Sequence, residues 1–225
     1  VDRRTSELAA LFDYAGSIGP KHWWARIARK RNEAWLRGII EQIRTGTYQP
    51  AEDTAAFIVA NHCDLDGNLL DAQIAAVELN NILRPTVAVS AYIVQCAHAL
   101  NEHPVIREQL RDGSPDDLHC FVQEVRRYYP FFPFAGAKVK ESFEWHGYHF
   151  PSGRKVLLDL YGTNHDPRPW DEPESFRPSR FHDWDGNPFT LISQGGGDHY
   201  QNHRCPGEWI AIEQMKAATD LLVNR

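Results

Sequence analysis

The sequence predicts a mainly α-helical fold with a small β portion late in the chain. Apolar residues recur at helical spacing from His22 to Arg44 and again over about 70–101. Between residues 143 and 160 the pattern changes to alternation with turn residues, which is typical of short antiparallel strands. With no repeat, linker or low-complexity tract in 225 residues, we expect a single domain over 1–225.

The elements follow in order from local signals. The turn sequence GSIGP closes the first helix, and Gly46 ends the second. Ser114 is the expected N-cap of a later helix because Pro115 suits its first position. The main expected elements are a helix over 5–15, a long central helix over about 70–101, a helix over about 115–129, strands over about 143–160, a meander and cysteine loop over 165–207, and a final helix over 206–223.

Composition narrows the class of protein. With 42% hydrophobic residues, 24% charged residues and a net charge of −6, the chain is typical of globular proteins. The negative charge argues against a nucleic-acid partner, although Arg26, Arg29, Lys30 and Arg31 form a local basic cluster. The four cysteines are widely spaced without a CxxC pair, which favours a reducing, cytoplasmic location over disulfides or a zinc knuckle.

The stretch from Leu79 to Asn101 carries one formal charge, on Arg84. Its several polar residues argue against a membrane span and favour a central buried helix. An unpaired guanidinium in apolar surroundings costs several kcal/mol, so Arg84 should meet an anion or reach water. Pro85 should kink the helix beside this charge. The residues alone leave open a second interpretation, a surface-reaching arginine followed by a tolerated proline.

The loop QGGGDHYQNHRCPGEW, residues 194–209, combines glycines with a single cysteine. Pro206 suits the first position of a helix, which would place Cys205 where the helix dipole favours a thiolate. Glycines allow the backbone to approach a flat group closely, and Arg204 adds a cation, so a haem with acidic side groups would suit this loop. The residues alone also allow a zinc site, a cysteine nucleophile or a buried thiol; the zinc ligands would be His199, His203 and Cys205.

Three ordered motifs narrow these alternatives. Glu124-x-x-Arg127, the segment FRPSRF and the segment HRCPGE resemble, in this order, the cytochrome P450 superfamily. Two departures, Gln194 in place of the usual loop phenylalanine and Arg84-Pro85 in place of an acid–alcohol pair, resemble the bacterial fatty-acid peroxygenase branch, which includes hydroxylases and decarboxylases. The resemblance implies a cytochrome P450 fold of which this chain is the later part only.

The resemblance also implies a haem b cofactor whose iron takes Cys205 as its axial thiolate. Arg204 would pair with a haem propionate, and the glycines would lie against the porphyrin. Glu124 and Arg127, with Arg177 or Arg180, would hold the fold behind the haem. The implied cofactor-binding residues are Cys205, Arg204, Gln194, Gly195, Gly196 and Gly207.

The implied activity is peroxygenation: hydrogen peroxide would hydroxylate a long-chain fatty acid at the α or β carbon, or decarboxylate it. Arg84 would bind the substrate carboxylate, Pro85 would face the distal side of the haem, and Phe131 would line the channel. No redox partner would be required. The alternatives are a reductase-dependent monooxygenase and a truncated, non-catalytic haem or metal binder.

Overall fold

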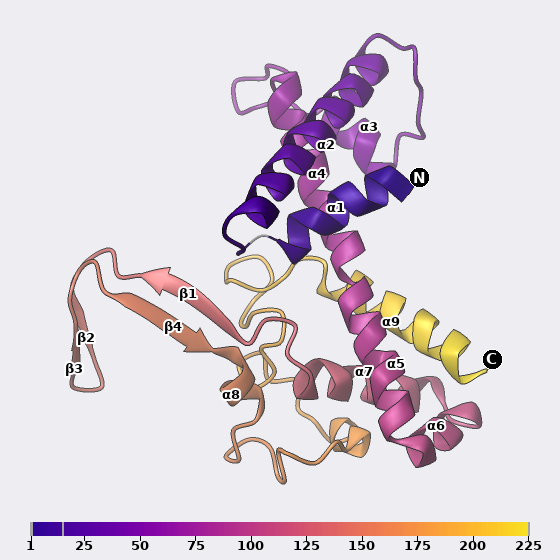
Figure 1. Ribbon diagram of the computed structural model, residues 1–225, viewed down its shortest axis with the longest axis vertical. Helices are drawn as coiled ribbons and strands as arrows, with labels where there is room; N and C mark the ends of the chain where they lie inside the picture. The colour runs from indigo at the N-terminus through magenta and orange to yellow at the C-terminus, as the bar shows by residue number, and fades with distance from the viewer. Residues whose placement is uncertain (1, 15, 225) are drawn as a thin grey trace. The chain divides into compact units, whose positions relative to one another are not determined.

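The computed structural model describes residues 2–14 and 16–224; Val1, Ala15 and Arg225, at the ends of the expected domain and of the first expected helix, lie outside the described residues (Figure 1). Internal contacts divide the chain into two compact units, Val1–Ser90 and Ala91–Arg225. The expected single domain therefore stays a prediction.

The first unit consists of four helices: α1 (Asp2–Asp13), α2 (Pro20–Arg44), α3 (Ala55–Ala60) and α4 (Ala72–Ala88). Their ends follow the sequence signals, since α2 starts with a proline in its first turn and is followed by Gly46 at a φ of 75°. The apolar face of α2 packs against α3 and α4 in a fully buried core. The buried residues of this core are Leu36, Ile40, Ile43, Ala60, Ala75, Ala76 and Leu79.

The long helix expected over about 70–101 is instead two helices, α4 and α5 (Ser90–Glu102), which are separated at Val89. Pro85 lies inside α4 and has no N–H to donate to the preceding turn, which weakens the helix at this point. The helix nevertheless continues for one more turn, and the Val89 N–H still donates to the Pro85 carbonyl at 3.2 Å. The interruption therefore follows the proline by four residues.

In the second unit, the helices after α5 are α6 (Pro104–Arg111), α7 (Pro115–Tyr128), α8 (Leu160–Asn164) and α9 (Glu208–Val223), with the 3₁₀ turn η1 (Pro178–Phe181). Ser114 caps α7 as predicted: its hydroxyl accepts from the Asp117 N–H, and the Asp117 carboxylate accepts from the Ser114 N–H. Helix α7 packs against η1 and α9. One element thus supports both the meander and the final helix.

Four short strands form two antiparallel pairs: β1 (Phe134–Lys138) with β4 (Lys155–Asp159), and β2 (Phe143–Trp145) with β3 (Tyr148–Phe150). Figure 1 shows the first pair continuing into the β2–β3 hairpin. The predicted β region, 143–160, missed β1. The sequence FAGAK of β1 has neither β-branched residues nor alternation, so its strand conformation depends on pairing with β4.

The sequence predicted neither a membrane span nor disulfide bonds. In this part of the chain, no helix is both long enough and apolar enough to cross a membrane. Cys63, Cys96, Cys120 and Cys205 are all free thiols, as the cysteine spacing predicted. The cytoplasmic location stays a prediction.

Candidate haem-thiolate site

The cysteine loop is a closed turn held by its own backbone. The Cys205 N–H donates to the Gln194 carbonyl at 2.9 Å, and Gly195 forms an antiparallel β-bridge with Arg204. Helix α9 begins at Glu208, after the N-cap Gly207, and not at Pro206 as predicted. The reason is that the Glu208 N–H donates to the Cys205 carbonyl in a turn that precedes the helix. Cys205 therefore lies on the loop, half-buried.

Three of the loop glycines are required by the chain itself. A Cβ on Gly195, whose φ is 91°, would lie 2.0 Å from the His203 carbonyl oxygen. A Cβ on Gly196 would lie 2.9 Å from the side chain of Ile192, and one on Gly197 would lie 2.5 Å from the side chain of Asn202. Close approach of the loop to itself thus accounts for these glycines without any bound group.

Gly207 is different. A Cβ there would have Cys205 Sγ, at 3.9 Å, as its one neighbour within 4 Å among the described residues. The backbone at Gly207 therefore leaves space beside the thiol. The expectation that a porphyrin lies against the loop finds its support at Gly207 and not in the triple glycine.

A buried charge cluster lies behind the loop. Glu208, at 3% exposure, accepts from Arg126 Nη2, from Arg204 Nε at 2.5 Å and from His199 Nε2 at 2.9 Å. Arg126 is 1% exposed and also donates from Nε to Gln194 Oε1 at 3.1 Å. Burial alone would raise the pKa of Glu208, but hydrogen bonds and charge from the two arginines lower it below 4.5.

Sequence reasoning missed Arg126 and Glu208. The two residues are 82 positions apart, so their pairing depends on the packing of α7 against α9. The signal that could have found them is local: Glu208 lies three residues after the loop cysteine, and Arg126 lies inside the Glu124-x-x-Arg127 motif. Arg204 also takes part in this cluster, while its Nη2 has no partner among the described residues and remains available to an acidic group.

Glu124 and Arg127 form a second buried network on α7. Arg127 donates to both Glu124 carboxylate oxygens, at 2.7 and 2.8 Å, and to the carbonyls of Asn164, Pro173 and Ser175. From the meander, the Arg180 side chain lies 3.3 Å from the Glu124 carboxylate. The pair therefore connects α7 with the meander.

The structure distinguishes the two meander arginines. Arg177 contributes its backbone N–H to Glu124 at 2.7 Å, but its half-exposed side chain pairs with Asp171 and Glu172. Arg180 contributes its side chain, which is 5% exposed. Arg180 is thus the residue whose charge reaches the Glu124–Arg127 pair. That this network supports the haem side of the fold stays a prediction.

Phe131 follows α7 and stacks on Tyr92 of α5, with ring centroids 4.4 Å apart and an interplanar angle of 14°. The Tyr92 hydroxyl donates to the Ser193 carbonyl at 3.4 Å, next to the start of the cysteine loop. Burial raises the pKa of Tyr92 to about 12, so this hydroxyl stays protonated. Phe131 is therefore fixed by a ring that also contacts the loop, and its role as a channel residue stays a prediction.

Arg84 and Pro85 belong to the other compact unit, at the end of α4, and both are exposed. Within the described residues, no hydrogen bond or ion pair engages the Arg84 guanidinium. The sequence predicted that Arg84 either pairs with an anion or is exposed to water, and the Arg84 side chain is exposed. It therefore remains available to an external anion.

The zinc alternative at His199, His203 and Cys205 finds no support in the described geometry. His199 Nε2 is engaged by Glu208, and these three side chains are not a group that could hold a metal ion. A haem thiolate fits the loop better, because Cys205 offers a half-buried sulfur beside the space at Gly207. Arg204, Gln194 and Cys205 would be the residues that hold the cofactor.

Comparisons with known proteins bear on this assignment. A family model described as cytochrome P450 matches residues 118–225. Cytochrome P450SP alpha (CYP152B1) in complex with (R)-ibuprophen is 54% identical with a TM-score of 0.91, over 98% of this chain and 54% of that one. Cytochrome P450EX alpha (CYP152N1) with myristic acid is 46% identical with a TM-score of 0.90, over 98% of this chain and 53% of that one.

Curated relatives extend the likeness at lower identity. Rhazimal synthase from Alstonia scholaris is 27% identical over 203 residues, which are 78% of this chain and 40% of that protein. The chain thus spans about half or less of the proteins it matches, and the predicted fold class, the later part of a cytochrome P450, is confirmed. The chain belongs to the cytochrome P450 superfamily and is similar to the CYP152 structures along nearly its whole length.

Proposed function

We propose that this chain is the haem-thiolate part of a peroxygenase that uses hydrogen peroxide to hydroxylate, or oxidatively decarboxylate, long-chain fatty acids at the α or β carbon. The observation that carries the proposal is the likeness to structures that hold myristic acid at 46% identity and arachidonic acid at 39% identity. These ligands, like (R)-ibuprophen in a third relative, are carboxylic acids. A substrate of this kind needs a cation to bind its carboxylate.

Arg84 is our candidate for that cation. Its side chain is exposed on α4 and has no partner among the described residues, so no competing carboxylate of the chain has to be displaced. A guanidinium can bind a carboxylate through two parallel hydrogen bonds, which fixes the orientation of the head group as well as its position. Pro85 would then limit the space beside the bound head group.

When bound, haem would supply peroxide activation, and electron donation from a Cys205 thiolate would favour cleavage of the O–O bond. The side chains of the protein would orient the fatty acid and assist proton transfer to and from the peroxide. By holding the fatty-acid carboxylate, Arg84 would keep a general acid–base group within reach of the peroxide oxygen, in place of the missing acid–alcohol pair. Phe131 would exclude water along the acyl chain.

The test compares Arg84→Ala with Arg84→Lys in the haem-loaded full-length protein, with myristic acid and hydrogen peroxide as substrates. We expect Arg84→Ala to keep the red-shifted absorption of the reduced, carbon-monoxide-bound haem thiolate but to lose product formation by at least about 100-fold. Arg84→Lys should retain part of the activity, because the positive charge remains. Full activity in Arg84→Ala would exclude carboxylate binding by this residue.

A reductase-dependent monooxygenase is the second candidate. It is favoured by the likeness to Protopine 6-monooxygenase from Eschscholzia californica, 28% identical over 88% of this chain. The two candidates differ in their oxidant. Turnover with hydrogen peroxide alone supports the first, whereas turnover only with NADPH and a reductase supports the second. A haem-thiolate spectrum without either activity would indicate a non-catalytic haem binder, and no haem uptake would contradict both.

A further inference from the structure

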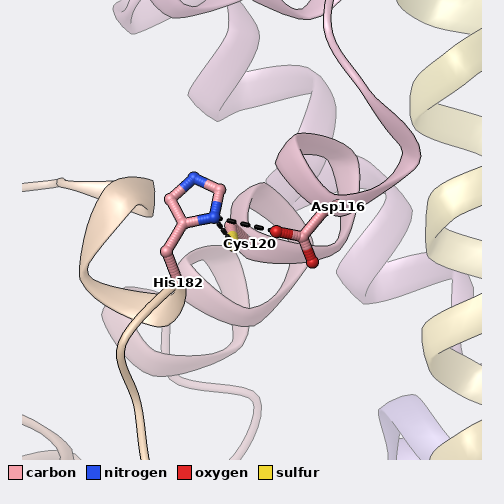
Figure 2. Close-up of side chains that lie close together, drawn as sticks. All are labelled: Asp116, Cys120 and His182. Carbon is pink, nitrogen blue, oxygen red and sulfur yellow. Dashed lines mark hydrogen bonds and ion pairs between the residues drawn. The ribbon is translucent and has the colours of Figure 1, made fainter.

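A second group of metal-ligating side chains lies on α7 and beside η1, outside the haem-thiolate site. Figure 2 shows Asp116 and Cys120 from one helix facing His182, which follows η1. His182 Nδ1 lies 2.9 Å from Asp116 Oδ2 and 3.5 Å from Cys120 Sγ. The three donor atoms all lie within 4.8 Å of one another, and they are the one such group among the described side chains.

The nitrogen–sulfur distance matches a tetrahedral zinc site, and the nitrogen–oxygen distance is short of it by about half an ångström. Zinc bonds of about 2.0–2.1 Å to nitrogen and about 2.3 Å to sulfur place those two ligand atoms about 3.6 Å apart. The same geometry places nitrogen and carboxylate oxygen about 3.4 Å apart. The sulfur–nitrogen distance is therefore already correct. Asp116 must withdraw by about half an ångström, which its exposed side chain allows.

The outer face of the histidine is also arranged as in metal sites. His182 Nε2 lies 3.4 Å from Asp117 Oδ1, while the other oxygen of this carboxylate accepts from the N–H and hydroxyl of Ser114. A carboxylate held in this way fixes the ring orientation and leaves Nδ1 directed at the other two ligands. An ordinary surface ion pair would need neither the second carboxylate nor the buried thiol.

Access and rigidity also suit an ion. A cavity of about 450 Å³ is lined by Asp117, Cys120 and His182, so an ion and a coordinated water have a route to the thiol. Behind it, Cys120 packs with Phe181, Trp170 and Leu191 in a buried cluster, which holds the sulfur in place.

We propose that Asp116, Cys120 and His182 bind a zinc ion, with water as the fourth ligand, and that this ion connects α7 to the meander turn η1. The thiol proton of Cys120 leaves to solvent as the ion binds. Because η1 also carries Arg180, the ion stabilises the contact between Arg180 and Glu124. The zinc site is distinct from the haem-thiolate site and does not depend on the proposed activity.

The test is equilibrium dialysis of the haem-loaded full-length protein against micromolar zinc, with zinc and iron measured in the same sample. We expect the unmodified protein to bind one more zinc ion per iron than the ligand variants bind. Zinc should also raise the thermal unfolding midpoint of the unmodified protein. Cys120→Ser and the surface variant Asp116→Asn should each lower zinc affinity by at least about 10-fold, while the control Cys63→Ser, an exposed cysteine of the other unit, leaves it unchanged.

X-ray absorption at the zinc edge identifies the ligands. One sulfur at about 2.3 Å, absent in Cys120→Ser, supports the site. Equal zinc content in the protein and in both ligand variants would overturn the proposal, and so would a zinc shell without sulfur. If Cys120→Ser fails to fold, the zinc content of Asp116→Asn is compared with that of the unmodified protein. Asp116→Asn should fold, because the Asp116 side chain is largely exposed.

Discussion

Glu124 and Arg127, one turn apart on α7, form a two-pronged ion pair in which both side chains are completely buried. A pair at this spacing on a helix surface contributes only a few tenths of a kcal/mol. Burial changes its role, because either charge left alone would be far from water. The carbonyls of Asn164, Pro173 and Ser175 accept the remaining hydrogen bonds of Arg127, and a second arginine, Arg180, donates to Glu124.

Arg127→Ala should therefore be strongly destabilising. Removing one member of a buried ion pair typically costs about 3–5 kcal/mol, because the remaining charge is uncompensated. Here the change also removes the arginine donor of the Asn164 and Pro173 carbonyls. The measurement is the free energy of unfolding of the haem-loaded full-length protein in urea. A loss below about 1 kcal/mol would contradict the buried network, and Arg37→Ala, on an exposed helix pair, is the control.

The two meander arginines should differ in their contributions. Arg180→Ala removes a buried cation from Glu124 and hydrogen bonds to the carbonyls of Asp171, Glu172 and Ser175, so we expect a loss of about 2–3 kcal/mol. Arg177→Ala removes exposed ion pairs and one long, exposed hydrogen bond to the Asp171 carbonyl, and it keeps the backbone hydrogen bond to Glu124, so we expect a loss of at most about 1 kcal/mol. The same urea titration compares the two variants. Equal losses would contradict the assignment of Arg180.

The loop glycines should separate into two classes. Gly195→Ala places a Cβ 2.0 Å from the His203 carbonyl at a φ of 91°, so the loop must rearrange at a cost of more than about 2 kcal/mol. Gly207→Ala places a Cβ in ordinary van der Waals contact with Cys205 Sγ, at 3.9 Å, and should cost at most about 1 kcal/mol in the haem-free chain, yet it should weaken haem binding if a porphyrin lies there. Unfolding and haem titration on the same samples test both statements. Unchanged haem affinity in Gly207→Ala would remove the support for a porphyrin at this position.

Local signals in the sequence predicted part of the local structure. The capping of α7 by Ser114 depends on residues three apart, and α1 and α2 were expected from local signals, whereas α3 was not expected and α4 was expected as part of one longer helix. Contacts between distant segments were not predictable. The pairing of Arg126 with Glu208 and of Cys120 with His182 joins residues 82 and 62 positions apart, and strand β1 depends on β4. Such contacts are set by tertiary packing, for which one sequence holds no direct pattern.

The same limit explains the outcome for the candidate site. Glu124, Arg127 and Cys205 could be proposed from the sequence because their motifs are short and ordered along the chain. The triple glycine was assigned to a bound porphyrin, whereas in the structure the loop packs on itself. From the sequence, a glycine required by the chain and a glycine required by a ligand have the same pattern. The two kinds of glycine are distinguished only by the atoms that would surround a Cβ added at each position in the structure.

The buried carboxylate of Glu208 should make stability depend on pH in a defined direction. Its pKa in the folded protein is below 4.5, so its ionised form contributes stability that is complete above the unfolded pKa and is lost as pH falls through the folded pKa. Glu208→Gln leaves Arg126 buried without its counter-ion, which should cost on the order of 3 kcal/mol at pH 7. The difference in unfolding free energy between the protein and this variant should begin to shrink as pH falls below the unfolded pKa of Glu208, and it should be lost below the folded pKa, where the Glu208 carboxyl is neutral in the folded and the unfolded protein alike. The control Glu213→Gln, on an exposed pair with Lys216, should show no such trend, and a difference independent of pH would contradict ionisation of Glu208 in the folded state.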